Sequence, residues 1–458
     1  MEDKRRELEL YNDWESLANL AKDNCLINSE LFNQYAVKRG LRNLDGRGVL
    51  VGLTEIGDVR SYIVEENEII PVPGRLIYRG IDISDITKGY LSDGRYGFEE
   101  TAYLLIFGKL PTCTELANFE ATLGSYRKLP DSFVRDMILE SPSKDITNAL
   151  SRSVLALYSL DDNPDDTSLP NVLEQCIKLI SSFPTMAVYS YQAYAHYHGD
   201  QSLFIHTPRP DLTTAENILH MLRPDSKYTK LEATLLDLAL ILHAEHGGGN
   251  NSTFTTHLVT STGTDTYSAI SAALGSLKGP KHGGANIKVV HMFEDMKETI
   301  KDWKDDEEIE THLMKLLNKE AFDKSGLIYG IGHAVYSISD PRAIILKEYA
   351  KKLAYEKGLQ DEYDFYAKVE ELAPKAIATV RKMYKGVSAN VDFYSGFVYN
   401  MLGLPLELYT PLFAIARVVG WSAHRIEEIV NEGKIIRPAY KCVAARSSYT
   451  QLKDRIQK

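Results

Sequence analysis

The stretch that decides the fold is residues 279–296, GPKHGGANIKVVHMFEDM, in which a glycine-rich turn runs into an amphipathic helix. Apolar residues recur at three-to-four spacing from Ile287 to Met296, which is the period of an α-helix. His282 lies at the N-terminal end of this predicted helix, where the helix dipole opposes a second proton on the imidazole. We therefore expect a neutral His282 that donates one hydrogen bond. A phosphate cradle is a weaker interpretation, because the chain has neither GxGxxG after a strand nor GKS/T.

The helical spacing continues through most of the chain beyond Phe98. It predicts helices over residues 102–107, 146–160, 172–180, 231–243, 267–277, 344–353 and 413–430. Between Gly48 and Tyr78, short apolar runs are instead broken by glycines and acidic residues, which is typical of small antiparallel strands. The expected strands are residues 49–53, 62–64, 69–73 and 76–78. The sequence thus predicts a mainly α fold with a small antiparallel β element at about 48–78, near the N-terminus, and an exposed loop at Asp161–Asp166.

Composition and charge narrow the class of protein. The chain has 458 residues, of which 44% are hydrophobic and 25% charged, as in globular proteins. The 63 acidic and 52 basic side chains give a formal charge of -11, which argues against a nucleic-acid-binding surface. The four cysteines are far apart and form no CxxC pair, which favours a reducing compartment. We see no targeting or membrane-spanning segment and expect a cytoplasmic protein without a membrane partner.

A second glycine- and histidine-rich stretch, HAEHGGGNNS at residues 243–252, follows the end of a predicted helix. Its glycines allow the backbone to approach a ligand closely. His243 and His246 are three residues apart and share a helical face, so together with His257 they could hold a zinc ion. The cleaner signature HExxH is missing, and we favour a helix C-terminal cap with one core histidine.

A third stretch, GIGHAVYSISDPR at residues 330–342, places glycines around His333 and then leads into a helix. Asp340 suits the N-cap position of this helix and Pro341 suits its first turn. Arg342 could then face inward from the first turn, although a surface arginine after a glycine-rich turn is an equal alternative.

Two charged residues lie in apolar surroundings nearer the C-terminus. Asp392 lies in NVDFYSG, residues 390–396, among neighbours that raise the pKa of a carboxyl group toward that of a useful proton acceptor. A buried aspartate that caps a helix is the alternative. Arg417 interrupts the apolar run 412–421, which is unfavourable unless its guanidinium meets an anion or a carboxylate. Arg437 follows in KIIRP, residues 434–438.

Together these motifs resemble the citrate synthase family in their order and approximate spacing. The segments that carry the resemblance are residues 279–286, 332–342, 390–396 and 413–424, with PGRLIYRGIDI at 73–83 and GFEE at 97–100 similar to the family's N-terminal part. The resemblance covers most of the chain from about residue 40 onward. It implies a citrate-synthase-like two-domain helical homodimer. Residues 1–283 and 398–458 would form the large domain, and residues 284–397 a small domain that closes over the active site.

The family condenses oxaloacetate with acetyl-CoA and water to give citrate and CoA, a step of the tricarboxylic acid cycle. No metal or other cofactor is implied, since the CoA thioester is a co-substrate. Carried over by motif, Asp392 is the base, His282 stabilises the enol, and His333 is the acid at the keto oxygen. Four residues would bind oxaloacetate or citrate: His246, Arg342, Arg417 and, from the partner subunit, Arg437. The chain departs from the family pattern at Ser337, where many members carry a basic residue that can meet a CoA phosphate.

Other functions stay open at this point. A 2-methylcitrate synthase would use propionyl-CoA in the same chemistry, and the extra methylene is worth only about 1 to 3 kcal/mol in a pocket. A zinc-dependent hydrolase built on the histidine clusters would lose its activity in a chelator. A catalytically silent binding protein on the same fold is a third alternative, and the presence of Asp392, His282 and His333 together argues against it.

Overall fold

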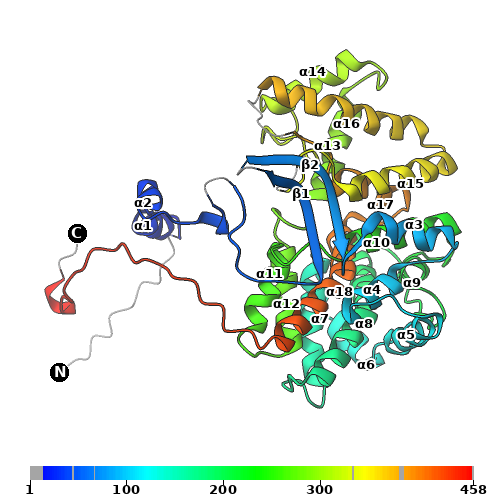
Figure 1. Cartoon of the computed structure of the whole chain (residues 1–458), viewed down its shortest axis with the longest axis horizontal. Helices are drawn as coiled ribbons and strands as arrows, with labels where there is room; N and C mark the ends of the chain where they lie inside the picture. Colours follow the sequence, from blue (N-terminus) through cyan, green and yellow to red (C-terminus); the bar gives the residue numbers. More distant parts are fainter. Residues whose placement is uncertain (1–13, 44–45, 66–67, 333–334, 381–385, 456–458) are drawn as a thin grey trace, which may run out of the picture. The chain divides into compact units, whose positions relative to one another are not determined.

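The computed structural model describes residues 14–43, 46–65, 68–332, 335–380 and 386–455 (Figure 1). The chain divides into two compact units, Met1–Leu53 and Thr54–Lys458. Two helices and a 3-10 turn make up the described part of the first unit: α1 (Trp14–Cys25), α2 (Ser29–Gln34) and η1 (Arg39–Leu41). None of these elements has a buried residue. All the elements described below belong to the second unit.

The second unit begins with a three-stranded antiparallel sheet in the order β1-β2-β3. Its strands are β1 (Gly57–Glu65), β2 (Glu68–Tyr78) and β3 (Ile81–Asp82). The predicted strands at 69–73 and 76–78 are one continuous strand, because Gly74 keeps the chain extended where β2 passes close to Ser339. A Cβ atom there would collide with the carbonyl oxygen of Ser339.

The predicted strand at residues 49–53 is wrong. These residues form neither strand nor helix, and they have no ladder partner in the part of the chain that the structure describes. Most of their apolar side chains are exposed, with Leu50 at 83% and Leu53 at 90% of their full accessibility, while Val49 is half-buried. An apolar run that has no neighbouring strand to pair with cannot satisfy its backbone groups as a strand. The β element therefore spans residues 57–82 rather than 48–78.

The rest of the second unit is helical. Its first helices are α3 (Ile83–Ser92), α4 (Phe98–Phe107), α5 (Cys113–Tyr126), α6 (Asp131–Phe133), η2 (Val134–Leu139), α7 (Ile146–Leu157), η3 (Tyr158–Leu160), α8 (Leu169–Gly199), α9 (Thr214–Leu222), α10 (Lys230–His243), α11 (Asn251–Thr260) and α12 (Thr266–Leu277). The later ones are α13 (Ala285–Thr299), α14 (Asp306–Leu317), α15 (Pro341–Lys357), α16 (Gln360–Val380), α17 (Val391–Met401), η4 (Leu406–Leu408), α18 (Tyr409–Val430) and η5 (Leu452–Asp454). The predicted helix at 146–160 is divided between α7 and the 3-10 turn η3, and each of the others lies within one of these elements. Residues Asp161–Asp166 lie outside them. The prediction of a mainly α fold is confirmed.

Helix α18 forms the centre of the core. Every residue from Tyr409 to Arg425 is buried, as expected for a helix that is surrounded by others on all sides. It packs against α4, α8, α10, α11 and α12, which Figure 1 shows gathered around it. The helix therefore brings its polar residues, Arg417 and His424 among them, into the interior of the unit.

Helices α13 to α16 lie together at one end of the second unit, and α13 and α15 both pack against α17 (Figure 1). The backbone joins the segments that precede two predicted catalytic positions: Gly332 N–H donates to the carbonyl of Ser388 at 2.8 Å, and Asn390 N–H donates to that of Gly330 at 2.9 Å. These helices fall within the predicted small domain, residues 284–397, whose closing movement stays a prediction. In the described residues, no helix is both long enough and apolar enough to cross a membrane.

Candidate active site

Arg417 is the most unusual residue of the core. Its side chain is fully buried on α18, and its Nε donates to the carbonyl oxygen of His243 at 2.7 Å. Both terminal nitrogens are also buried, and within the described residues neither has a hydrogen-bond partner. Burial lowers the pKa of Arg417 to about 10, so the group stays charged at neutral pH. A buried guanidinium with two unpaired ends is unfavourable unless an anion meets it, so this position is suited to bind one.

Arg342 is a second buried guanidinium, and it faces inward from the first turn of α15. Asp340 caps this helix by accepting from the N–H of Arg342, with Pro341 in the first turn, as predicted. The Asp340 carboxylate also accepts two hydrogen bonds from the guanidinium, at 3.0 Å from Nε and 2.7 Å from a terminal nitrogen. Burial alone would lower the pKa of Arg342, but this neighbouring carboxylate raises it above its ordinary value. The ion pair fixes the arginine in place before any ligand arrives.

His246 lies in the turn after α10, which the left-handed backbone of Gly247 (φ +82°) allows. The edge of its ring meets the ring of Tyr336, with centroids 5.6 Å apart. Tyr336 also lies 5.7 Å from the guanidinium carbon of Arg342. One buried tyrosine thus links two of the predicted oxaloacetate-binding residues.

His282 lies in the glycine-rich turn, two residues before Gly284, the N-cap of α13. Its Nε2 is 2.9 Å from the hydroxyl oxygen of Ser252, which also accepts from the indole N–H of Trp421 at 3.1 Å. Burial lowers the pKa of His282 to about 4, and the charge of Arg417 acts in the same direction. The imidazole is therefore neutral at pH 7, as expected, and burial and the nearby Arg417 are causes that the sequence did not reveal.

Asp392 lies in the first turn of α17. Asn390 caps this helix by accepting from the N–H of Asp392 at 2.9 Å, and the amide of the same side chain donates to the carbonyl of Gly332 at 2.8 Å. Burial raises the pKa of Asp392 to about 6, while Arg342 and Arg417 lie close enough for their charges to act against this rise. A carboxyl group with this pKa is ionised at neutral pH and is more basic than an exposed aspartate.

Phe413 connects the parts of this site. Its ring centroid lies 6.2 Å from the His282 ring and 4.7 Å from the guanidinium carbon of Arg417. The structure therefore brings His282, Asp392, Arg342 and Arg417 into one buried region. It is lined by side chains that sequence reasoning missed, namely Ser252, Tyr336, Phe413 and Trp421. A signal for two of them existed, since residues 413, 417 and 421 are spaced by four and share one face of a helix.

Of the other predicted site residues, Arg437 is not brought into this region, and His333 lies outside the described residues. Gly332, the residue before His333, is described and has a φ of +98°. Arg437 is exposed in the segment after α18 and forms no hydrogen bond or ion pair within the described part of this chain. The assignments of both residues rest on the family pattern.

The zinc grouping of His243, His246 and His257 is not found among the described residues. His243 bonds through Nδ1 to the carbonyl of Ala239 at 2.7 Å, inside its own helix. Of the three histidines, only His257 belongs to a group whose atoms lie close enough together to share an ion, and its companions are His424 and Glu427.

The fold and the site define a mainly helical protein with two buried arginines, one of which has two unpaired nitrogens, near a carboxyl group of raised pKa and a neutral imidazole. Comparison with known proteins identifies the family. The family description "Citrate synthase, C-terminal domain" matches residues 42–439, and the chain belongs to the citrate synthase family. It is a transferase of the citrate synthase type.

Three similar proteins illustrate this relationship. A citrate synthase of Deinococcus radiodurans is 37% identical over 386 residues, which cover 83% of this chain and 93% of that protein. A 2-methylcitrate synthase of Shewanella oneidensis is 33% identical over 368 residues, with coverage of 80% and 87%. The solved structure of Thermoplasma acidophilum citrate synthase, a ternary complex with carboxymethyl coenzyme A and oxaloacetate, has a TM-score of 0.73 at 28% identity and covers 92% of this chain and 99% of that chain.

Proposed function

We propose that this chain condenses oxaloacetate with acetyl-CoA and water to give citrate and CoA, with Asp392, His282 and His333 as its catalytic residues. The observation that carries the proposal is the position of Arg417. Its charge acts on the pKa of both His282 and Asp392, so an anion held on its two unpaired nitrogens would lie beside the proposed base and the proposed enol partner.

The binding half of the proposal rests on the two buried arginines. Oxaloacetate carries two carboxylates, and a planar guanidinium can meet a carboxylate with two parallel hydrogen bonds. Arg417 offers two free terminal nitrogens for this purpose. Arg342 is held by Asp340, and His246 lies beside it across the Tyr336 ring. These three side chains would hold oxaloacetate with its keto carbon facing the acyl donor.

The chemical half begins with the methyl group of the thioester. This group is a very weak acid, so a carboxylate can remove its proton only if a placed donor meets the developing enolate oxygen. Asp392 would take the proton, and a neutral His282 would donate to the oxygen. This role requires the His282 proton on Nδ1, so the hydroxyl of Ser252, which in this structure donates to Asn250 Oδ1 at 2.9 Å, would turn to donate to His282 Nε2.

The new carbon–carbon bond forms when the enol carbon attacks the keto carbon of oxaloacetate. The keto oxygen then gains a proton, a role that the family pattern assigns to His333. Water subsequently cleaves the thioester, with hydroxide going to the acyl carbon and the proton to the CoA sulfur. Closure of residues 284–397 would keep water from the acetyl thioester until oxaloacetate is bound.

The acyl donor, the assembly and the compartment belong to the same proposal. Acetyl-CoA is preferred over propionyl-CoA, with 2-methylcitrate synthase as the alternative. The protein works in the cytoplasm. It works as a homodimer, because the exposed Arg437 is then free to complete the site of the partner subunit. The reaction needs no metal, since the acid–base groups and arginines supply the required charge.

One set of assays tests the function. We expect release of free CoA thiol from acetyl-CoA with oxaloacetate in the presence of a chelator, and slower release from propionyl-CoA. Asp392→Asn lowers kcat by about 10²- to 10⁴-fold, the usual contribution of a general base, while its circular dichroism stays native. Faster turnover of propionyl-CoA would reverse the donor preference. Undiminished turnover by the Asn variant would refute the base assignment.

A mixed-subunit experiment tests the shared site. Arg437→Gln and Asp392→Asn are each expected to be nearly inactive as homodimers. When the two variants are co-expressed, the hybrid dimer contains one site with both native residues and regains up to half of the wild-type activity. No recovery in a purified hybrid would show that Arg437 does not act across the interface.

A further inference from the structure

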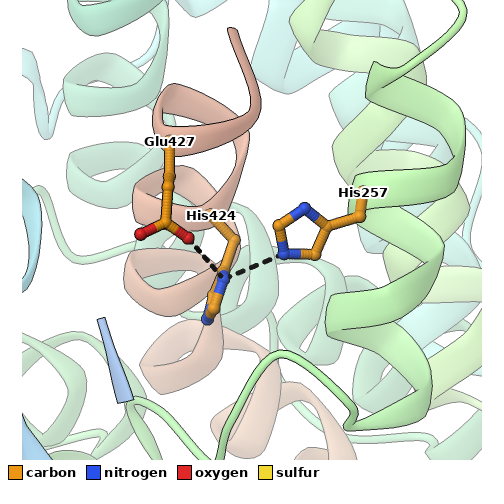
Figure 2. A group of neighbouring side chains, drawn as sticks. All are labelled: His257, His424 and Glu427. Atoms are coloured by element: carbon orange, nitrogen blue, oxygen red, sulfur yellow. Dashed lines mark hydrogen bonds and ion pairs between the residues drawn. The ribbon is translucent and has the colours of Figure 1, made fainter. Parts of the chain in front are cut away.

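A second cluster of titratable side chains lies apart from the reacting groups, between α11 and α18. His257 comes from α11, and His424 and Glu427 lie three residues apart on α18 (Figure 2). His257 Nε2 is 3.0 Å from His424 Nδ1, and Glu427 Oε2 is 3.8 Å from the same Nδ1. These three atoms all lie within 4.8 Å of one another. Two ligands at i and i+3 on one helix and a third from its neighbour form a common arrangement for metal ions in helical proteins.

Each of the two histidines has its other ring nitrogen on a carboxylate. His257 Nδ1 lies 2.7 Å from Glu428 Oε2, and His424 Nε2 lies 3.1 Å from Glu245 Oε1. Metal-binding histidines almost always show this outer carboxylate or an equivalent acceptor, which fixes the tautomer and leaves the inner nitrogen as a lone pair. With protons on these outer nitrogens, His257 Nε2 and His424 Nδ1 both direct lone pairs into the same space.

The charges of the cluster point to a bound cation. Three carboxylates, those of Glu245, Glu427 and Glu428, converge on two imidazoles, and in the described chain none of the three pairs with a lysine or an arginine. Glu427 Oε1 accepts the N–H of Glu55 at 2.8 Å, but Oε2 is buried and has no hydrogen-bond donor. The oxygen that faces the rings is thus the one without a partner.

The two inner ring nitrogens face each other at 3.0 Å, and Glu427 Oε2 borders the same space. His424 Nε2 is buried and has no hydrogen-bond partner in the described chain, although Glu245 Oε1 lies at ion-pair distance from it. A divalent cation between the inner nitrogens would bring positive charge to the three carboxylates.

We propose that His257 Nε2, His424 Nδ1 and Glu427 Oε2 bind a divalent transition-metal ion such as Zn²⁺, with a water molecule as the fourth ligand. Two nitrogens and one carboxylate oxygen suit zinc. The 3.0 Å between the two nitrogens has to widen to about 3.3 Å for tetrahedral bonds of about 2.0 Å, and Glu427 has to turn toward His257. The site lies outside the proposed reaction and is separate from it.

The ion would tie α11 to α18 and, through His424, hold Glu245. The carboxylate of Glu245 accepts the N–H of Gly247 in the turn that presents His246. The bound metal therefore stabilises the fold at this point and steadies one wall of the oxaloacetate pocket.

Zinc titration of the full-length protein tests this site. After treatment with chelator and its removal, calorimetry with ZnCl₂ at pH 8 is expected to find one ion per chain and a rise in Tm. Binding weakens at least tenfold at pH 6, because protons compete for the ring nitrogens. Cobalt in place of zinc gives the visible absorption of a tetrahedral ion.

Variants separate this site from adventitious binding. His424→Gln and Glu427→Gln should each abolish tight zinc binding, whereas His291→Gln, at an exposed histidine on α13, should leave it unchanged. Glu427→Gln is nearly isosteric and keeps the native fold, which circular dichroism checks. If wild-type protein takes up no zinc at pH 8, or if both variants keep the full uptake, the proposal is wrong and the cluster holds only its own hydrogen bonds.

Discussion

Arg417 and Arg425 lie two turns apart on α18, and both are fully buried. Burial lowers the pKa of each. Their surroundings differ, however. Arg425 donates to the hydroxyls of Thr266 and Thr260, each at 3.1 Å, and to the carbonyl of Thr264 at 2.8 Å. Arg417 has one such bond, to a carbonyl, and two terminal nitrogens without a partner.

The comparison of these two regions shows how a structural arginine differs from a ligand-binding one. Arg417 and Arg425 are equally buried and carry the same charge, so neither property distinguishes them. Hydrogen bonding discriminates between the two arginines. Neutral oxygens accept from all three guanidinium nitrogens of Arg425, and these bonds stabilise α18 against α11 and α12. The two terminal nitrogens of Arg417 have no acceptor in the described chain, and a bound ligand would supply one.

The largest changes in activity and stability are expected when each arginine is replaced with methionine, which has a similar length and no charge. For Arg417→Met we expect kcat/KM for oxaloacetate to fall about 1,000-fold, equivalent to about 4 kcal/mol, with stability within about 1 kcal/mol of wild type. For Arg425→Met we expect about 3 kcal/mol less stability, because several bonds to a charged group are lost, and activity within threefold. Thiol-release kinetics and urea unfolding measure these effects. Equal effects of both variants on activity would remove the distinction.

The next test concerns Asp392, whose pKa the charge of Arg417 helps to restrain. Burial raises this pKa from 3.8 to about 6, so the ionised carboxylate opposes folding above pH 6, and this cost disappears as the pH falls below 4. Asp392→Asn should therefore be more stable than wild type by about 2 to 3 kcal/mol at pH 8 and equal to it at pH 3.5. Wild-type kcat/KM should fall on the acid side with a pKa near 6. A gain in stability that does not change with pH would contradict the assigned pKa.

Oxaloacetate binding also distinguishes Arg417 from Arg425. At ten times its Kd, oxaloacetate should stabilise the wild-type protein by about 1.4 kcal/mol, since it binds only the folded state. The same concentration should leave the Tm of Arg417→Met unchanged and raise that of Arg425→Met by the wild-type amount. Differential scanning fluorimetry measures all three proteins side by side. A shift in Arg417→Met equal to that of wild type would show that the anion binds elsewhere.

The smallest effects belong to the hydroxyls that support each region. Ser252→Ala removes the partner of His282 Nε2 and should lower kcat about fivefold, or about 1 kcal/mol, with little change in KM. Thr260→Val removes one acceptor of Arg425 and should lower stability by about 1 kcal/mol without a change in kcat. The pair is measured with the same assays, and a fall in kcat for the valine variant would count against the separation of the two regions.

Sequence reasoning predicted the helices well because their apolar spacing matches their burial. The cap formed by Asp340 and the buried Arg417 followed from local rules that depend on a few adjacent residues, whereas those rules left an inward and a surface position equally open for Arg342. It failed at residues 49–53, where an apolar run does not reveal whether a neighbouring strand exists. It also divided β2 in two at Gly74, because the close approach of Ser339 comes from a residue 265 positions away.

The contacts that make the site depend on packing between distant segments. Ser252 meets His282 and Trp421 only because α11, α18 and the turn before α13 lie together, and no residue near Ser252 in the sequence indicates this. His257 and His424 are 167 residues apart, so their contact could not be predicted from the sequence either. His257 was instead grouped with His243 and His246, which are nearer in the sequence.

The burial of α18 on all sides has a consequence for synthesis. This helix follows α4, α8, α10, α11 and α12 in the sequence, so it leaves the ribosome after all of them. Until then these five helices have no central helix to pack against, and their apolar faces remain open to chaperones or to aggregation. A chain that stops before residue 409 would lack its central helix, and the insertion of α18, rather than the formation of the earlier helices, would commit the protein to its native state.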